Sequence, residues 1–307
     1  MVGVEKVSKF PEYIKRRRNW KKWGEFDELG SANLIDKSQV VKACSLVREG
    51  RIFSLALPIQ QTDVPVLPGR APPQHFMRRS GSDYASGVTR EGNFQSVDDV
   101  IFLSTHGTTH IDALSHVGDE GLLFNGFPIS SVRSNGADKM AINNLKSLFG
   151  RGLLLDILLS RGNQPLEHDQ VIMPSDLERC SAEQGTPIQP GTIVLIRTGW
   201  IQTFRNKGSE QFFKSEPGIG LEAAKWLADR EIVALGMDNW GIEVIPTEIE
   251  MPAPVHRFLL RDCGIYLMEL FDLEELSNAK VHEFLFVAAP LQIKRGVGSP
   301  LNPLAII

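Results

Sequence analysis

The sequence predicts a mixed α/β protein, and two features of the chain favour this class. Segments with apolar residues at helical spacing alternate irregularly with short, continuous apolar runs that are typical of buried strands. Glycine and proline are spread along the chain as turn residues, and no repeat or low-complexity tract divides it into modules. We therefore expect one continuous domain over residues 1–307.

The elements are expected in the following order. Residues 38–50 have apolar positions at helical spacing and close on a glycine, so they predict a helix that leads into a strand at 51–60. Residues 64–93 are rich in Pro, Gly, Arg and Ser with little periodicity, and they predict a long ordered loop that walls a pocket. The remaining predictions are strands at 98–105, 153–159, 191–199, 232–238 and 264–270, and helices at 220–232 and 253–264.

Composition and charge favour small-molecule or protein partners. The chain has 33 Lys and Arg against 37 Asp and Glu, with neither a basic nor an acidic half, so we expect no nucleic-acid partner and no membrane surface. The N-terminal segment lacks the apolar region of a secretory signal, and no run reaches ~18 apolar residues. Three distant cysteines without a CxxC pair fit a reducing compartment, so we expect a cytoplasmic protein.

The most informative segment is HGTTHIDALSH, which begins at His106 and ends at His116. It holds three of the seven histidines of the chain. Composition alone would place ~0.25 histidines in a window of this length. Such a concentration of imidazoles beside an aspartate is typical of a metal or catalytic site, whereas a lone histidine is more often a hydrogen-bonded core residue.

Spacing restricts how these side chains can meet. A uniform helix turns Asp112 away from the face shared by His106 and His110, and a straight strand spreads the group too far for one ion. A strand that ends near His106, a tight turn at Gly107 and an extended 110–112 segment bring the three together. Two imidazoles and a carboxylate suit Zn or Mn, and also accept Fe or Co. His116 is then either a further ligand or a general base, and we favour the base.

A second polar group is predicted near the C-terminal end. Glu269 lies in an apolar strand, and a buried carboxylate needs a cation or several hydrogen-bond donors. His256 on the preceding short helix is the nearest candidate co-ligand, and the alternative is an ion pair with Arg257 or Arg261. Asp238, at a strand end, either orients a ligand histidine or caps a turn.

The histidine segment resembles the HxGTHxDxPxH signature of the cyclase family of metal-dependent hydrolases, which includes kynurenine formamidases and isatin hydrolases. The matching positions are His106, His110, Asp112 and His116. The glycine comes one place early, at Gly107, and Leu114 stands where many members have proline. WGEFDELGSANLI, GMDNWGIE and VGSPLNPLAII also look like family segments, so the resemblance covers nearly the whole chain, in the manner of the longer members.

The resemblance implies a swivelling β/β/α domain with a mixed sheet, found as homodimers or homotetramers, and a divalent metal, Zn or Mn. In the family the first two histidines and the aspartate bind metal, the last histidine is an acid/base, and a downstream His and Glu complete a metal site in some members. The implied metal ligands are therefore His106, His110, Asp112 and Glu269. The implied catalytic residue is His116, and His256 is either a further metal ligand or a second catalytic residue that stabilises the oxyanion.

From these observations we expect a hydrolase that opens a small cyclic or aromatic amide or ester, such as a lactone, an isatin-like compound or an N-acyl arylamine. It would use a metal-activated water and a histidine acid/base. Two alternatives remain open, a lyase or cyclase on the same metal site and a metal-holding or ligand-sensing protein without activity. The predicted substrate contacts are His75, Phe76, Tyr84 and Trp240.

Overall fold

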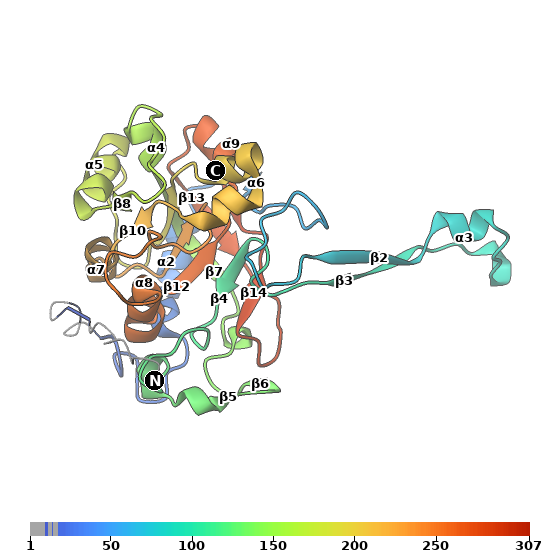
Figure 1. The fold of residues 1–307 in the computed structure, drawn as a ribbon, viewed down its shortest axis with the longest axis horizontal. Helices are drawn as coiled ribbons and strands as arrows, with labels where there is room; N and C mark the ends of the chain where they lie inside the picture. The colour runs from blue at the N-terminus through green and yellow to red at the C-terminus, as the bar shows by residue number, and fades with distance from the viewer. Residues whose placement is uncertain (1–9, 12–13, 15–17) are drawn as a thin grey trace, which may run out of the picture.

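The computed structural model describes residues 10–11, 14 and 18–307, and a nine-stranded mixed sheet forms its centre (Figure 1). In spatial order the strands are β1 (Ile52–Ser54), β15 (Leu304–Ile306), β13 (Glu283–Ala288), β7 (Leu148–Asp156), β9 (Ile193–Arg197), β11 (Ala234–Met237), β12 (Tyr266–Glu269), β4 (His110–Asp112) and β14 (Gly298–Pro300). Strands β7, β9, β11 and β12 are parallel, and the other neighbouring pairs are antiparallel. The predicted mixed α/β class is confirmed.

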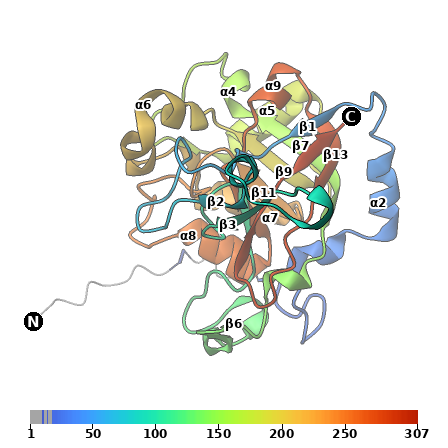
Figure 2. The ribbon, with the colours of Figure 1, turned by 90° about the vertical axis from the view of Figure 1, so that its right-hand side faces the viewer.

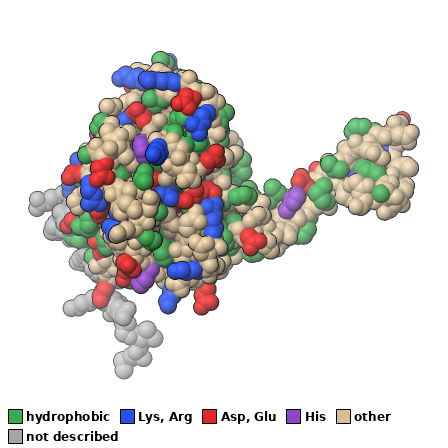
Figure 3. Space-filling view, turned by 90° about the horizontal axis from the view of Figure 1, so that it is seen from above, with side chains coloured by type: hydrophobic (Ala, Val, Ile, Leu, Met, Phe, Trp, Pro, Cys, Tyr) green, Lys and Arg blue, Asp and Glu red, His purple; other side chains and the backbone are tan. Residues whose placement is uncertain are grey.

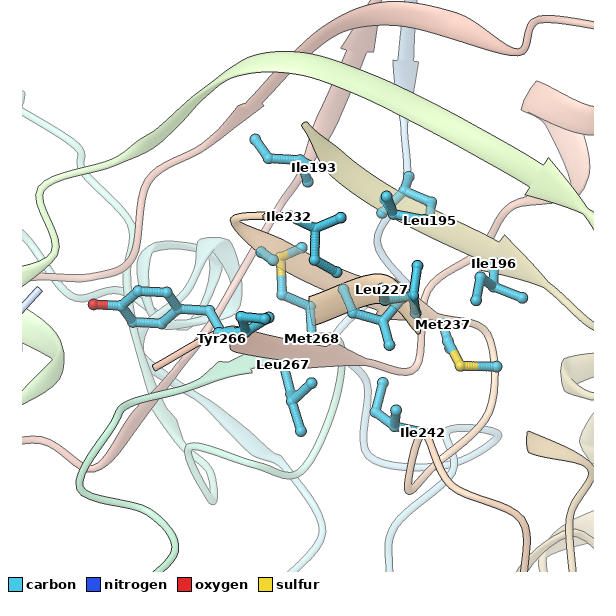
Figure 4. Packing of buried hydrophobic residues seen from close by; sticks show 14 of the residues in the cluster. Ile193, Leu195, Ile196, Leu227, Ile232, Met237, Ile242, Tyr266, Leu267 and Met268 are labelled. Carbon is cyan, nitrogen blue, oxygen red and sulfur yellow. The ribbon is translucent and has the colours of Figure 1, made fainter. Parts of the chain in front are cut away.

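The parallel strands form the core because they are covered on both faces. Every residue of β9, β11 and β12 is buried, as expected for parallel strands that appear in the sequence as continuous apolar runs. Helix α7 (Leu221–Asp229) turns its apolar side toward them, and Figure 4 shows Leu227 among side chains of β9, β11 and β12. The helix predicted at 220–232 and the strand that follows it are therefore confirmed.

The helices pack around the sheet. Helix α2 (Lys37–Cys44) contacts β7 and β13, and in Figure 2 it lies on the opposite side of the body from α6. In the described part of the chain the other helices are α4 (Ile157–Ser160), α5 (Pro174–Gln184), α6 (Ile201–Lys214), α8 (Pro254–His256) and α9 (Glu274–Asn278), with a π-helical turn η6 (Arg257–Cys263) after α8. In the described part of the chain, no helix has both the length and the apolar character needed to span a bilayer.

Gly264 shows why one turn requires glycine. It ends η6 in the left-handed region, with φ of 66°, and its N–H donates to the carbonyl oxygen of Leu260. A Cβ atom at this position would lie 2.6 Å from the ring of Phe124. The chain therefore turns sharply from η6 toward β12, which carries the predicted carboxylate Glu269.

A long arm projects from the body (Figures 1 and 3). It consists of β2 (Gln74–Arg79), the short helix α3 (Gly81–Ala85), the turn η2 (Glu91–Asn93) and β3 (Asp98–Phe102), with β2 and β3 paired antiparallel. The strand predicted at 98–105 is thus present, but the loop predicted at 64–93 is wrong over β2 and α3. Neither face of this ribbon is buried within the chain, so its sequence carries no apolar alternation that would mark a strand.

Shorter elements complete the chain. Two small sheets pair β5 (Val132–Arg133) with β6 (Gly136–Ala137), and β8 (Val171–Ile172) with β10 (Gly218–Ile219). The 3-10 turns outside the arm are η1 (Gly30–Leu34), η3 (Phe124–Gly126), η4 (Ile129–Ser131) and η5 (Ile142–Asn144).

Candidate metal centre

Strand β4 is the base of the candidate site. His110 and Asp112 point to the same face of β4, because side chains alternate along a strand. His110 lies opposite Glu269 of β12 in the ladder, and its Nε2 is 3.2 Å from Glu269 Oε2. Asp112 lies opposite Gly298 of β14. A Cβ atom on Gly298 would lie 2.3 Å from His106 Nε2, so the glycine leaves the space that the His106 ring occupies.

The turn before β4 folds His106 back over the strand, as the spacing predicts. Strand β3 ends at Phe102, and the Gly107 N–H donates to the Ser104 carbonyl oxygen at 3.0 Å. The His106 Nε2 is thereby placed 3.3 Å from Asp112 Oδ1. Burial lowers the pKa of His106 to about 3, so its imidazole is neutral and able to act as a metal ligand.

His110 is held in one orientation by its second ring nitrogen. The Nδ1 atom lies 2.7 Å from the Thr108 carbonyl oxygen, which leaves Nε2 facing the carboxylates of Asp112, at 3.5 Å, and Glu269. Burial by itself would lower the pKa of His110, but the hydrogen bond and the charge of Glu269 raise it. A hydrogen bond from the ring nitrogen that faces away from the metal, such as the one from His110 Nδ1 to Thr108, is typical of metal-binding histidines.

His256 is held in the same way by Glu243, which is not among the site residues predicted from the sequence. The His256 Nδ1 lies 2.6 Å from Glu243 Oε1, and the other Glu243 oxygen accepts the Val255 N–H at 3.0 Å. The His256 Nε2 is 3.0 Å from Glu269 Oε1 and 3.7 Å from Asp112 Oδ2. Although burial lowers the pKa of His256, the two glutamates raise it well above its usual value. The only sequence signal for Glu243 was its place in the GMDNWGIE segment.

Asp238, in the same segment, does not touch a predicted ligand. One carboxylate oxygen accepts the backbone N–H of Thr198 at 2.9 Å and its hydroxyl at 2.6 Å, and the other accepts the Gly199 N–H at 2.6 Å. Of the two roles left open for Asp238, the structure therefore shows the turn cap, which closes the segment after β9.

The alternative partners of Glu269 are also occupied elsewhere. Arg257 forms an ion pair with Asp119 at 3.2 Å, and Arg261 forms one with Asp262 at 2.6 Å. Glu269 instead accepts hydrogen bonds from the imidazoles of two histidines, which hold its pKa below the usual value although burial acts in the opposite direction. The buried carboxylate is therefore part of the histidine cluster.

The donor atoms of this cluster fit a divalent metal ion. His106 Nε2 and both carboxylate oxygens of Asp112 are buried and have no hydrogen-bond partner. The cluster contains two groups of possible metal-ligand atoms, and within each group all atoms lie within 4.8 Å of one another. Asp112 belongs to both groups. The groups are His106, Asp112 and His116, and Asp112, His256 and Glu269. Buried polar atoms without a partner destabilise a fold unless something binds them. A set of imidazole and carboxylate ligands is one that Zn and Mn accept.

A cavity of about 210 Å³ opens above these groups. Its wall consists of Leu67, Arg70, His116, Val117, Trp240, Gly241, Glu243, Ile245, Ala253, His256 and Glu269. The His116 ring stacks on His106 with centroids 4.2 Å apart, and its Nε2 is 4.0 Å from Asp112 Oδ1. Burial lowers the pKa of His116, yet 26% of its side chain stays exposed. The ring can therefore reach both a ligand in the cavity and the buried donors.

The predicted substrate contacts divide into two sets. Trp240 lies in the cavity wall. His75, Phe76 and Tyr84 lie on the projecting arm, where His75 Nε2 pairs with Asp99 at 2.7 Å and the Tyr84 hydroxyl donates to the Ser96 carbonyl oxygen. Within one chain the structure does not bring these three residues to the cavity, because the segment that carries them extends away from the body as a ribbon (Figure 1).

Residues 53–244 match the family model described as "Putative cyclase", which is more than half of the chain. The chain belongs to the cyclase family. A crystal structure described as a novel cyclase is 37% identical, covers 95% of this chain and 100% of its own, and superposes with a TM-score of 0.89. The resemblance inferred from the histidine motif is confirmed, and the mixed sheet is the sheet of this cyclase fold.

Isatin hydrolases are also similar to this cyclase-family chain. The isatin hydrolase of Roseibium aggregatum is 30% identical over an alignment of 149 residues, and the alignment covers 44% of this chain and 52% of the relative. The match therefore spans about half the length of that relative. The structure of isatin hydrolase A from Labrenzia aggregata bound to benzyl benzoate is 23% identical, with a TM-score of 0.62 over 87% of this chain and 97% of its own. That likeness shows the shared fold.

Proposed function

We propose that this protein is a metal-dependent hydrolase that opens a small cyclic or aromatic amide or ester, such as a lactone, an isatin-like compound or an N-acyl arylamine. The observation that carries the proposal is the buried carboxylate of Asp112, which has no hydrogen-bond partner and lies among four imidazoles at the base of an open cavity. Membership of the cyclase family and the similarity to an isatin hydrolase support the same reaction class.

The proposed metal ligands are His106, His110, Asp112 and Glu269, and the proposed ion is Zn or Mn. Their side chains converge from β4, from the turn before it and from β12, so the sheet itself holds the set rigidly. A divalent ion bound there would lower the pKa of a water molecule and polarise a carbonyl group.

The protein's own groups would move the proton. His116, whose pKa burial holds below its usual value, is neutral and lies at the cavity wall, so it can accept a proton from the attacking water. As the water oxygen bonds to the carbonyl carbon and the C–N or C–O bond breaks, His116 returns this proton to the leaving nitrogen or oxygen. His256, whose Nδ1 is fixed by Glu243, would share its Nε2–H between Glu269 and the carbonyl oxygen while negative charge develops on that oxygen.

Metal removal tests this reaction directly. We expect purified protein to contain Zn or Mn by elemental analysis, and to lose lactone and isatin hydrolysis on dialysis against a chelator. Activity should return when either ion is added. In isotopically labelled water, hydrolysis of a lactone places one labelled oxygen in the new carboxylate, whereas a lyase or cyclase places none. Full turnover by metal-free protein would contradict the metal-dependent mechanism, and an unlabelled product would favour the lyase.

We further propose that the chain works as a homodimer or homotetramer assembled through the β2–β3 arm. One face of the ribbon presents Phe76, Val100 and Phe102, which are 53%, 53% and 63% exposed. The other face presents Met77 and Ile101, which are 50% and 49% exposed. An isolated two-stranded ribbon is marginally stable in water, and every copy of the chain carries the same apolar surface. His75, Phe76 and Tyr84 would then contact substrate only if the arm reaches the cavity of another copy.

The variant Phe76→Asp with Val100→Asp tests this assembly. Two carboxylates on one ribbon face should prevent its burial, so sedimentation should show monomers where the wild type sediments as dimers or tetramers. The control is Val41→Asp, since Val41 is 70% exposed on α2, away from the arm. If the double variant keeps the wild-type sedimentation coefficient, the arm does not form the interface.

A further inference from the structure

Arg70 brings a positive charge to the cavity wall without a carboxylate to balance it. The residue is partly buried in the segment before β2, and its Nη1 donates to the His106 carbonyl oxygen. A guanidinium has five N–H donors, so most of its capacity remains available. Among the residues that the structure describes, no carboxylate forms an ion pair with Arg70.

The acids in the same wall are already engaged. Glu243 accepts hydrogen bonds from the Val255 N–H and from the His256 ring, and Glu269 lies against the rings of His110 and His256. Neither carboxylate is therefore available to compensate the guanidinium. An anionic group of a ligand would supply the missing charge.

The size and lining of the cavity restrict that ligand further. Leu67, Val117, Trp240 and Ile245 supply apolar wall, and the volume is about 210 Å³. A cavity of about 150 Å³ in another protein is large enough for benzene. One ring with a small polar substituent therefore fits the space, with its apolar edge against the tryptophan and its charged group toward Arg70.

We propose that Arg70 recognises a carboxylate on a single-ring acyl compound. This inference rests on the proposed function, because opening a cyclic amide or lactone converts a neutral carbonyl into a carboxylate. Water adds to the carbonyl carbon, the ring C–N or C–O bond breaks, the leaving nitrogen or oxygen takes a proton, and the new acid ionises. The planar guanidinium fork matches a carboxylate geometrically, which a lysine ammonium does not.

The test measures binding rather than turnover. Isothermal titration calorimetry is done with benzoate and with its neutral isostere benzamide, on the full chain, both metal-free and metal-loaded. The variants are Arg70→Gln, which keeps an N–H for the His106 carbonyl but removes the charge, and Arg70→Lys, which keeps the charge but loses the fork. Arg48→Gln is the control. Arg48 is exposed and follows the end of α2, and its replacement changes the net charge by the same amount.

We expect metal-free wild type to bind benzoate at least about 10-fold more tightly than benzamide, in line with a charged hydrogen-bond pair. Arg70→Gln should abolish this preference, Arg70→Lys should retain part of it, and Arg48→Gln should match wild type. Unchanged metal content in Arg70→Gln shows that the His106 turn is intact.

Equal affinity of the wild type for the two probes, or a benzoate preference that survives in Arg70→Gln, would overturn the assignment. A different result would refute the proposed hydrolase function. If metal-loaded wild type hydrolyses neither lactones nor isatin while the benzoate preference holds and depends on Arg70, the anion site stands and the hydrolase proposal is wrong.

Discussion

Replacing Asp112 by asparagine is expected to remove the bound metal and nearly all hydrolytic activity. Asp112 belongs to both groups of converging donors, and its two oxygens are buried without hydrogen-bond partners. Asparagine keeps the shape but removes the negative charge, and it presents an amide N–H₂ in place of one oxygen. Because a metal ion supplies several kcal/mol to such reactions, we expect kcat/KM to fall by about 10³-fold or more.

Elemental analysis and thermal melting test this prediction independently of substrate. In wild type, Zn or Mn at about 100 times its Kd should stabilise the fold by about 2.7 kcal/mol and raise Tm, because the ion binds only the folded chain. Asp112→Asn should show no metal-dependent rise in Tm and no stoichiometric metal. Asp169→Asn is the matched control, since the Asp169 side chain is 54% exposed. A fully metallated, active Asp112→Asn protein would refute the proposed ligand set.

Replacing His116 by alanine is expected to leave the metal in place while lowering kcat by about 10² to 10⁴-fold, the usual contribution of a general acid/base. His116 is more exposed than the other histidines of the cluster, and its Nε2 stands 4.0 Å from Asp112 Oδ1. It lies in the cavity wall rather than in the ladder of strands. These features fit a group that transfers protons to and from a ligand.

Metal content separates the two roles left open for His116. Loss of metal together with activity in His116→Ala would make it a ligand instead of the acid/base. The truncated side chain leaves space that connects to the cavity, so added imidazole should partly restore kcat if proton transfer is the missing step. His168→Ala, at a histidine that is 58% exposed, should behave as wild type in both assays.

The features of this protein that depend on neighbouring residues can be predicted from the sequence alone. Strand parity places His110 and Asp112 on one face, and the turn at Gly107 returns His106 to them, because both effects act within a few residues. The apolar runs of β9 and β11 likewise identified buried strands. Glu269 is predictable for the same kind of reason, since a carboxylate inside an apolar strand needs partners wherever that strand lies.

Which distant groups meet depends on the three-dimensional arrangement of the chain. Glu243, rather than Asp238, orients His256, although both acids lie in one short segment after β11. Arg70 reaches the cavity through the loop before the arm, whereas the arm itself extends away from the body. Local patterns report which face of an element is apolar, but contacts across the sheet depend on strand order and on the path of each loop. Those are set by packing of the whole chain, and no periodicity within a segment encodes them.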